Sequence, residues 1–156
     1  MREFAHSLTI AAPPARVLDA FFDRDALAAW AGVARSHCAP HPLGSYLLEW
    51  PATEWRDEIL GRLGGTVRGT VMEFVAGREI FIADASWLPP DGDAIGPMAI
   101  EVTCEPHPGG TRLRVRQSGW DGSPRWSRYY EVLAAGLTGA LEQLRLYVEP
   151  QVPGPT

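Results

Sequence analysis

The stretch SPRWSRYYEVLAAGLTGALEQLRLYVE, residues 123–149, decides the fold class. Serine followed by proline is typical of a helix start, because serine caps a free backbone N–H group and proline needs no N–H partner. Apolar residues then recur every three or four positions over about six turns, which predicts one long helix with a single apolar face. That face carries Trp126, Tyr130, Leu133, Leu137, Leu141, Leu144 and Val148. Such a helix needs a second layer to cover its apolar face.

The residues before this helix predict strands, with two short helices close to the N-terminus. Pro13-Pro14 opens a helix over residues 15–22, and Asp25 can cap a second helix over 26–30 that Gly32 ends. Alternation and β-branched or aromatic residues predict strands at 2–10, 45–50, 66–75, 78–87, 98–105 and 111–119. The stretch through His37 and Pro42 is interpreted as irregular. Strands grouped without intervening helices imply an antiparallel sheet and the α+β class.

The last predicted strand has the clearest alternation of polar and apolar residues. Leu113, Val115 and Gln117 share one face, and Arg112, Arg114 and Arg116 share the other. Because side chains alternate along a strand, the first set is expected to face the core and the second to face water.

Segment 51–65 leaves alternatives open. Trp55, Ile59 and Leu63 lie four residues apart, which suggests a short amphipathic helix. The segment is either a longer connection within a hairpin or a lid over the mouth of a pocket. A second open question is Gly136 and Gly139, since each costs roughly 1 kcal/mol inside a helix. Either the first helices approach closely there, or space is kept open for a ligand.

Composition excludes several classes of function. A net charge of −5 gives no electrostatic basis for binding nucleic acid or an anionic membrane. No apolar run approaches the roughly 20 residues of a membrane helix, and the alternating N-terminus does not resemble a signal peptide. The pair Cys38 and Cys104 makes no disulfide framework, so a cytoplasmic protein is expected. One domain over residues 1–149 and a disordered tail over 150–156 are predicted.

No strong catalytic or metal motif is present. All 14 basic residues are Arg, which excludes a lysine nucleophile or Schiff base. The sequence lacks Gly-x-Ser-x-Gly and His-Glu-x-x-His, although a catalytic set assembled in space stays open. His37, Cys38 and His41 could meet one ion, but nothing nearby completes a tetrahedral set, and a solvated loop is the preferred interpretation. Neither a metal nor a cofactor is therefore predicted.

Three stretches are similar to a known group of proteins. They are Ala12-Pro13-Pro14-Ala15-Arg16-Val17 with Asp25 and Trp30, Gly69-Thr70-Val71-Met72-Glu73-Phe74 with Arg78-Glu79-Ile80, and Gly136-Leu137 with Leu141 and Leu144. In this order they resemble the START-like (SRPBCC) superfamily, and within it the bacterial homologues of the heat-shock-protein-90 ATPase activator. The resemblance implies a helix-grip fold, in which a curved antiparallel sheet of about six to seven strands wraps around the long C-terminal helix.

The resemblance also implies several functions, because the superfamily is functionally mixed. The leading hypothesis is a binder of a small hydrophobic or aromatic molecule in an internal cavity between sheet and helix. The alternatives are a protein-interaction module resembling the heat-shock-protein-90 co-chaperone, which a stress-response role would suit, and a cyclase-like or hydrolytic enzyme using the same cavity. A homodimer and a chaperone partner are further expectations.

The inward faces of three strands converge on the first half of the long helix, which predicts the cavity wall. Its residues are Tyr46, Leu48, Trp50, Met98, Ile100, Gln117, Tyr129 and Leu133. The resemblance places Ile80, Ile82 and Asp84 on one inward face, with Trp87 on the opposite face. Asp84 would then be a polar anchor for the ligand. The alternative is a bulge that turns Asp84 to solvent.

Overall fold

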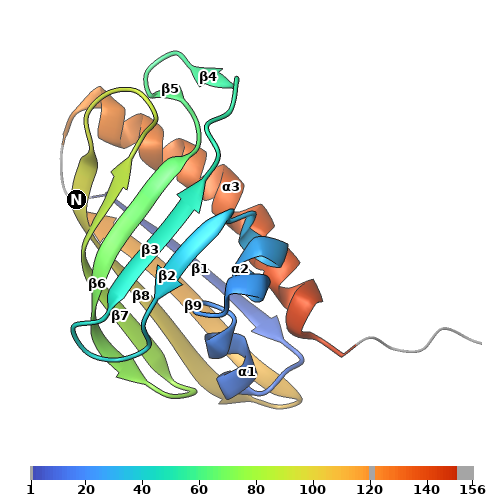
Figure 1. The fold of residues 1–156 in the computed structure, drawn as a ribbon. Helices are drawn as coiled ribbons and strands as arrows, with labels where there is room; N and C mark the ends of the chain where they lie inside the picture. The colour runs from blue at the N-terminus through green and yellow to red at the C-terminus, as the bar shows by residue number, and fades with distance from the viewer. Residues whose placement is uncertain (1, 120–121, 151–156) are drawn as a thin grey trace, which may run out of the picture.

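The computed structural model describes residues 2–119 and 122–150, in three helices and nine strands (Figure 1). The elements are β1 (Arg2–Ile10), α1 (Pro14–Asp19), α2 (Arg24–Ala31), β2 (Arg35–Cys38), β3 (Ser45–Trp50), β4 (Arg56–Asp57), β5 (Gly61–Arg62), β6 (Gly65–Val75), β7 (Glu79–Leu88), β8 (Ile95–His107), β9 (Gly110–Gly119) and α3 (Pro124–Val148). Of the predicted tail at 150–156, residues 151–156 lie outside the described part of the chain.

One antiparallel sheet of seven strands forms the first layer, in the order β1-β9-β8-β7-β6-β3-β2. The sheet curves around α3, which crosses its concave side, while α1 and α2 lie near the C-terminal end of α3 (Figure 1). This arrangement confirms the predicted α+β helix-grip fold. The interpretation of the stretch through His37 and Pro42 as irregular is partly wrong, because Arg35–Cys38 form β2 and pair with β3.

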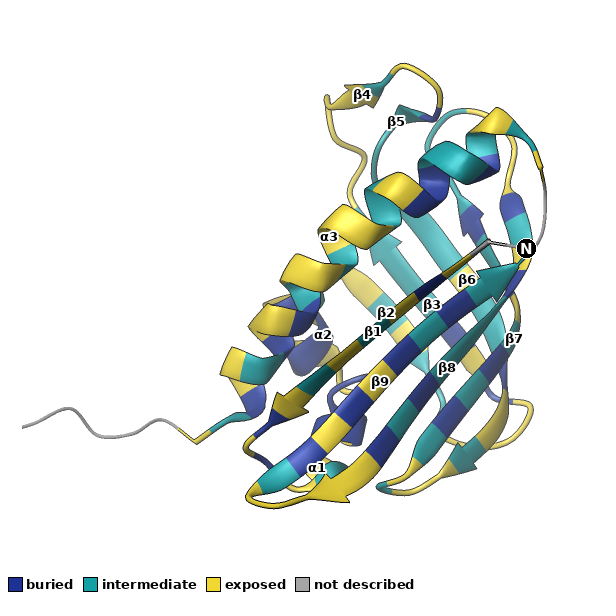
Figure 2. Ribbon diagram, turned by 180° about the vertical axis from the view of Figure 1, so that it is seen from behind, coloured by how far each residue is buried: buried dark blue, intermediate teal, exposed yellow. Residues whose placement is uncertain are grey.

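The alternation in β9 and the capping of α3 follow the sequence pattern. Leu113, Val115 and Gln117 are buried, while Arg112 and Arg114 are exposed and Arg116 is half-buried. Figure 2 shows this alternation of buried and outward residues along β9. The Ser123 hydroxyl accepts a hydrogen bond from the backbone N–H of Trp126 (3.3 Å), as expected of an N-cap. The inward faces of sheet and helix therefore meet as predicted.

The two short helices close one end of the interior. The cap of α2 is Asp23, whose side chain accepts from the Ala26 N–H at 2.9 Å, and the prediction of Asp25 for this role is wrong. Gly32 ends α2 in the left-handed region at φ 68°, where glycine carries no steric penalty. Trp30 ties the helices together, since its indole N–H donates to the Ala20 carbonyl (2.9 Å).

Segment 51–65 contains a small hairpin and no helix. Strands β4 and β5 pair with each other and project beyond the end of β3 and β6, beside α3 (Figure 1). The helical spacing of Trp55, Ile59 and Leu63 is therefore misleading, because Trp55 is 78% exposed and Ile59 47% exposed. The buried side chain of this segment is instead Leu60, which is 3% exposed. We call residues 53–63 the flap.

Candidate functional site

A cavity of about 630 Å³ lies between the concave face of the sheet and α3. Strands β3, β6, β7, β8 and β9 contribute to its wall, together with α2, the flap and the middle of α3. Apolar side chains make most of this wall. Among the described lining residues there is no Asp, Glu, Arg, Lys, His or Cys.

Most of the residues predicted for the cavity wall lie on it. The lining includes Tyr46, Leu48, Trp50, Ile100, Gln117, Tyr129 and Leu133. Met98 is 3% exposed and does not line the cavity; its sulfur instead lies 3.1 Å from the Gln117 amide nitrogen, behind the wall. The prediction that Met98 lines the cavity was therefore wrong, because Met98 packs against Gln117 instead.

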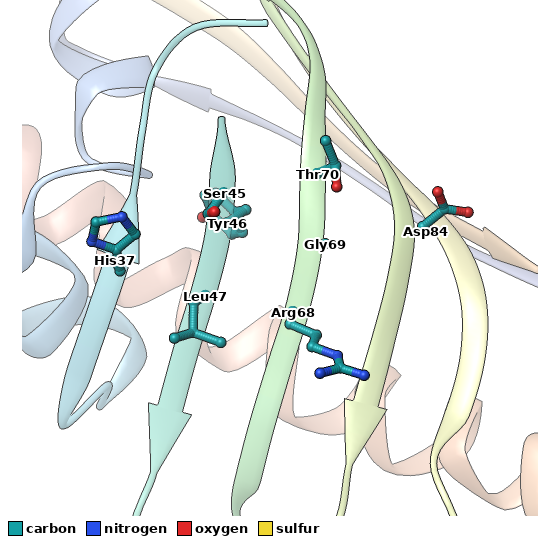
Figure 3. Close-up of a pocket in the computed structure, with 8 residues that line it drawn as sticks. All are labelled: His37, Ser45, Tyr46, Leu47, Arg68, Gly69, Thr70 and Asp84. Carbon is teal, nitrogen blue, oxygen red and sulfur yellow. The ribbon is translucent and has the colours of Figure 1, made fainter. Parts of the chain in front are cut away.

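Asp84 lies on the outer face of the sheet, so its predicted place as an anchor in the cavity is wrong, and the alternative of a bulge that turns it to solvent is correct. Two residues of β7, Asp84 and Ala85, stand opposite the single residue Gly69 of β6, so the strand contains a bulge. Asp84 takes up the extra length at φ 52° and is exposed. It borders a shallow outer pocket of about 300 Å³ with Arg68 and Thr70 (Figure 3).

The bulge also brings Trp87 into the cavity, which the alternation of β7 did not predict. Ile80 and Ile82 point inward before the bulge, and Ala85 and Trp87 point inward after it. An acidic residue within an apolar strand, opposite a glycine, was the sequence signal for this bulge. The Trp87 ring stacks on Tyr129 with centroids 5.5 Å apart and an interplanar angle of 29°.

The polar atoms of the aromatic wall are mostly turned away from the cavity toward backbone carbonyls. The indole N–H of Trp50 donates to Ala31 (2.8 Å), and that of Trp87 donates to Gly64 (2.8 Å). The Tyr46 hydroxyl donates to Phe21 (2.7 Å), and burial raises the pKa of Tyr46 well above its ordinary value. These bonds fix the rings while leaving their apolar faces to form the wall.

Gln117 and Tyr129 form the polar feature of the wall. The Gln117 side-chain amide donates to the Tyr129 hydroxyl at 2.7 Å, and Gln117 is 6% exposed. Burial raises the pKa of Tyr129 to about 12, although the bond from Gln117 lowers it in part. The Tyr129 hydroxyl therefore keeps its proton at neutral pH.

Two ion pairs hold the flap over the cavity. Thr53, Leu60 and Leu63 of the flap line the cavity. Asp57 bonds Arg128 of α3 (2.6 Å) and also accepts from the backbone N–H groups of Ile59 and Leu60 (3.0 Å each).

Arg62 forms a two-pronged pair with Asp91 (2.8 and 2.9 Å), which joins the flap to the loop between β7 and β8. Burial alone would raise the pKa of Asp57, but the Leu60 N–H, Arg128 and the Ile59 N–H together hold it below the ordinary value. The flap thus forms both a hairpin connection and part of the cavity wall.

Gly136 of α3 lies on the unpacked side of the cavity, whereas Gly139 does not line it. Gly136 lines the cavity, and a Cβ added at Gly136 or Gly139 would meet nothing within 4 Å. The interpretation that the first helices approach closely at these glycines is therefore wrong. Leu133 and Leu137 are only partly buried, whereas Leu141 and Leu144 are fully buried one and two turns further on. The middle of α3 borders open space.

Neither a metal site nor a membrane segment emerges from the described structure. Across residues 2–119 and 122–150, no three His, Cys, Asp or Glu side chains are grouped to hold an ion. Burial raises the pKa of Cys38 to about 11, which keeps its thiol protonated. None of the helices described combines the length and apolar content needed to cross a bilayer.

Comparison with protein-family models identifies the group. Residues 11–149 match the model of the activator of Hsp90 ATPase homolog 1-like protein. The chain belongs to this family. None of the curated proteins matches it.

Solved structures of bacterial proteins share this fold. Protein CV1439 from Chromobacterium violaceum is 26% identical with a TM-score of 0.70, over 96% of this chain and 98% of that one. Protein MLL2253 from Mesorhizobium loti is 20% identical with a TM-score of 0.70, over 93% and 95%. The Aha1 dimer from Colwellia psychrerythraea, a solution structure, is 15% identical with a TM-score of 0.68, over 96% and 97%. The proteins from Mesorhizobium loti and Colwellia psychrerythraea share too little sequence with this chain to show more than a common fold.

Proposed function

We propose that this protein binds a small hydrophobic or aromatic molecule in the cavity between the sheet and α3. The observation that carries the proposal is the cavity itself, at about 630 Å³ with a largely apolar wall. Pockets for small molecules typically measure about 300–1,000 Å³ and combine apolar walls with a few polar groups. Protein interiors are otherwise close-packed, so an unfilled apolar space of this size is a feature to be explained.

Local features of the wall support the interpretation of the cavity as a binding site and not as a defect in packing. The cavity borders Trp50 and Trp87, which are held in place by hydrogen bonds to backbone carbonyls. Gly136 leaves room where alanine or leucine would favour the helix. The glycine keeps space open at a cost in helix stability, which a bound ligand would offset.

The alternative functions have less support among the described residues. An enzyme acting in this cavity would need an acid, base or nucleophile, and the lining offers only the hydroxyls of tyrosine and threonine and an amide. An interaction module would be favoured by a filled interior and one exposed apolar patch. The large exposed apolar side chains are instead spread over the flap, β6, α3 and the turn before β3, as Trp55, Ile59, Met72, Val75, Leu146, Tyr147 and Leu43.

Native mass spectrometry of the purified protein tests the proposal, with pyrene as a flat apolar probe where no molecule co-purifies. The variant Gly136→Phe adds a ring at the cavity wall, and Gly139→Phe is its matched control, because it lies on the same helix outside the lining. We expect Gly136→Phe to lose the bound molecule or weaken pyrene binding at least tenfold, and Gly139→Phe to keep it. Equal binding by both variants, or no binding by the natural protein, would contradict the proposal.

A further inference from the structure

The chemistry of the Gln117–Tyr129 pair restricts the ligand more closely than the volume of the cavity does. We infer that the ligand is a neutral, flat aromatic molecule whose one hydroxyl-like group is anchored by Gln117 and Tyr129. This inference rests on the proposed function.

The acceptor is the amide oxygen of Gln117. Both hydrogens of the amide nitrogen are engaged, because Nε2 lies 2.7 Å from the Tyr129 hydroxyl and 3.1 Å from the Met98 sulfur. The Met98 sulfur sets this orientation of the amide, since a thioether sulfur can accept from the amide nitrogen but has no hydrogen to donate to the oxygen. The oxygen Oε1 has no partner among the described residues, although Gln117 is 6% exposed. Because Gln117 lines the cavity, an acceptor that has no protein partner there favours a ligand that donates to it.

The donor is the hydroxyl of Tyr129. Its oxygen accepts from Gln117, and its proton has no acceptor among the described residues. The pKa of Tyr129, raised to about 12 by burial, keeps this proton in place at neutral pH. Stacking on Trp87 at 5.5 Å and an edge contact with Tyr130 at 5.6 Å hold the ring. One wall therefore presents a donor beside an acceptor, which matches a group that both accepts and donates, such as a hydroxyl.

The cavity offers no partner for a charged ligand. Its described lining contains no side chain that is ionised at neutral pH. Arg62 and Arg128 are paired with Asp91 and Asp57, and neither they nor Arg56 of the flap line the cavity. A carboxylate or ammonium group buried here would lose its hydration without a counter-ion, which is costly. The site should therefore select a neutral molecule over its charged analogue.

The shape argument comes from the rings around the cavity. The indoles of Trp30, Trp50 and Trp87 all line it, and their polar atoms bond the backbone. Flat faces of this kind pack well against another aromatic ring system. An aromatic body with a single polar edge would therefore satisfy both the wall and the anchor.

Isothermal titration calorimetry at neutral pH with four related probes tests this inference. The probes are pyrene, 1-hydroxypyrene, 1-methoxypyrene and pyrene-1-carboxylate. We expect 1-hydroxypyrene to bind about tenfold more tightly than pyrene, a difference of about 1.4 kcal/mol that is typical of one or two net hydrogen bonds. The methoxy compound, which only accepts, should fall between them, and the carboxylate should bind more weakly than pyrene.

Variants of the anchor separate its contribution from general apolar binding. Tyr129→Phe keeps the ring and removes the hydroxyl, and Gln117→Met keeps the length of the side chain and removes the amide. Both should bring hydroxypyrene and pyrene to within about twofold of each other. Tyr130→Phe is the matched control, because the Tyr130 hydroxyl is buried without a hydrogen-bond partner and does not line the cavity. This control should keep the tenfold preference.

The outcomes distinguish the inference from the proposed function. Binding of pyrene and 1-hydroxypyrene with equal affinity, or tight binding of the carboxylate, would overturn the anchor and leave the apolar cavity as the binding site. Retention of the preference in both Tyr129→Phe and Gln117→Met would also overturn it. If the natural protein binds none of the four probes, the proposed function itself fails.

Discussion

Truncating two leucines of α3 that differ in their surroundings should give very different losses of stability. Leu141 is fully buried, whereas Leu137 is partly buried and borders the cavity. Replacing Leu141 by Ala removes about three carbon groups at roughly 0.8 kcal/mol each. Adding the term for the space left behind brings the loss to about 3 kcal/mol. Leu137→Ala only enlarges a space that already exists, and we expect it to cost about 1 kcal/mol.

Chemical denaturation in urea, with thermal unfolding as a second measurement, compares the two variants. For a chain of this size each 1 kcal/mol lowers the melting temperature by about 2–4 °C, so Leu141→Ala should lower it by roughly 6–12 °C and Leu137→Ala by a third of that. Both variants make the same chemical change one helical turn apart, so helix propensity cancels. Equal losses would mean that the middle of α3 is packed in solution, and the reasoning from an open cavity would be refuted.

Three further predictions follow from the flap, the helix glycine and the bulge. Asp57→Asn should increase hydrogen exchange over residues 53–63, measured by mass spectrometry, whereas Glu131→Gln, which meets the same Arg128 at 3.0 Å without touching the flap, should not. Because the folded-state pKa of Asp57 is below its ordinary 3.8, this stabilisation is present above pH 3.8 and is lost as pH falls through the folded-state value; exchange must be compared as protection factors, which remove the intrinsic pH dependence of the exchange rate, and lower protection at neutral pH than in acid would contradict it. Gly136→Ala should stabilise the protein by up to about 1 kcal/mol in urea titrations, since the added Cβ meets nothing within 4 Å, and a loss of stability would mean that the helix is crowded there. Asp84→Val should lower the melting temperature through a cost of at least about 1 kcal/mol, because a β-branched residue is strained at φ 52°, and an unchanged melting temperature would argue against the bulge.

The sequence predicted most accurately those features that depend only on residues within one helix or one strand. The Ser123 cap, the alternation of β9 and both ends of the apolar stripe of α3 depend on near neighbours in the chain, and the structure matches them. In the middle of the stripe, Leu133 and Leu137 are only partly buried. The strand boundaries of β3 and β9 also differ little from the predicted ranges 45–50 and 111–119. Local propensity and the burial of one face agree in these elements, which makes their patterns reliable.

Prediction failed where the outcome depends on pairing with another strand. The bulge at Asp84 exists because β6 and β7 change register beside Gly69, and a side chain at Gly69 would lie 2.7 Å from the Ile82 methyl. Alternation within β7 alone cannot reveal that change, so it placed Asp84 inward and Trp87 outward. The helix suggested within segment 51–65 was wrong for a related reason, because the hairpin that forms there is fixed by Arg128 and Asp91, which are distant in sequence.

The packing of α3 against the sheet changes along the helix, and the cavity lies where that packing is incomplete. Its C-terminal turns bury Leu141, Leu144 and Val148 completely, and those turns supply the packing that holds helix to sheet. Its middle presents Gly136 and partly buried leucines to open space, so this part contributes less to stability. In the first turns of α3, Tyr129 accepts a hydrogen bond from Gln117 in the cavity wall. Arg128, in the same turns, pairs with Asp57 of the flap. Because the packed turns, the cavity and Tyr129 occupy successive parts of one helix, the cavity can stay open without loosening the packing of helix on sheet.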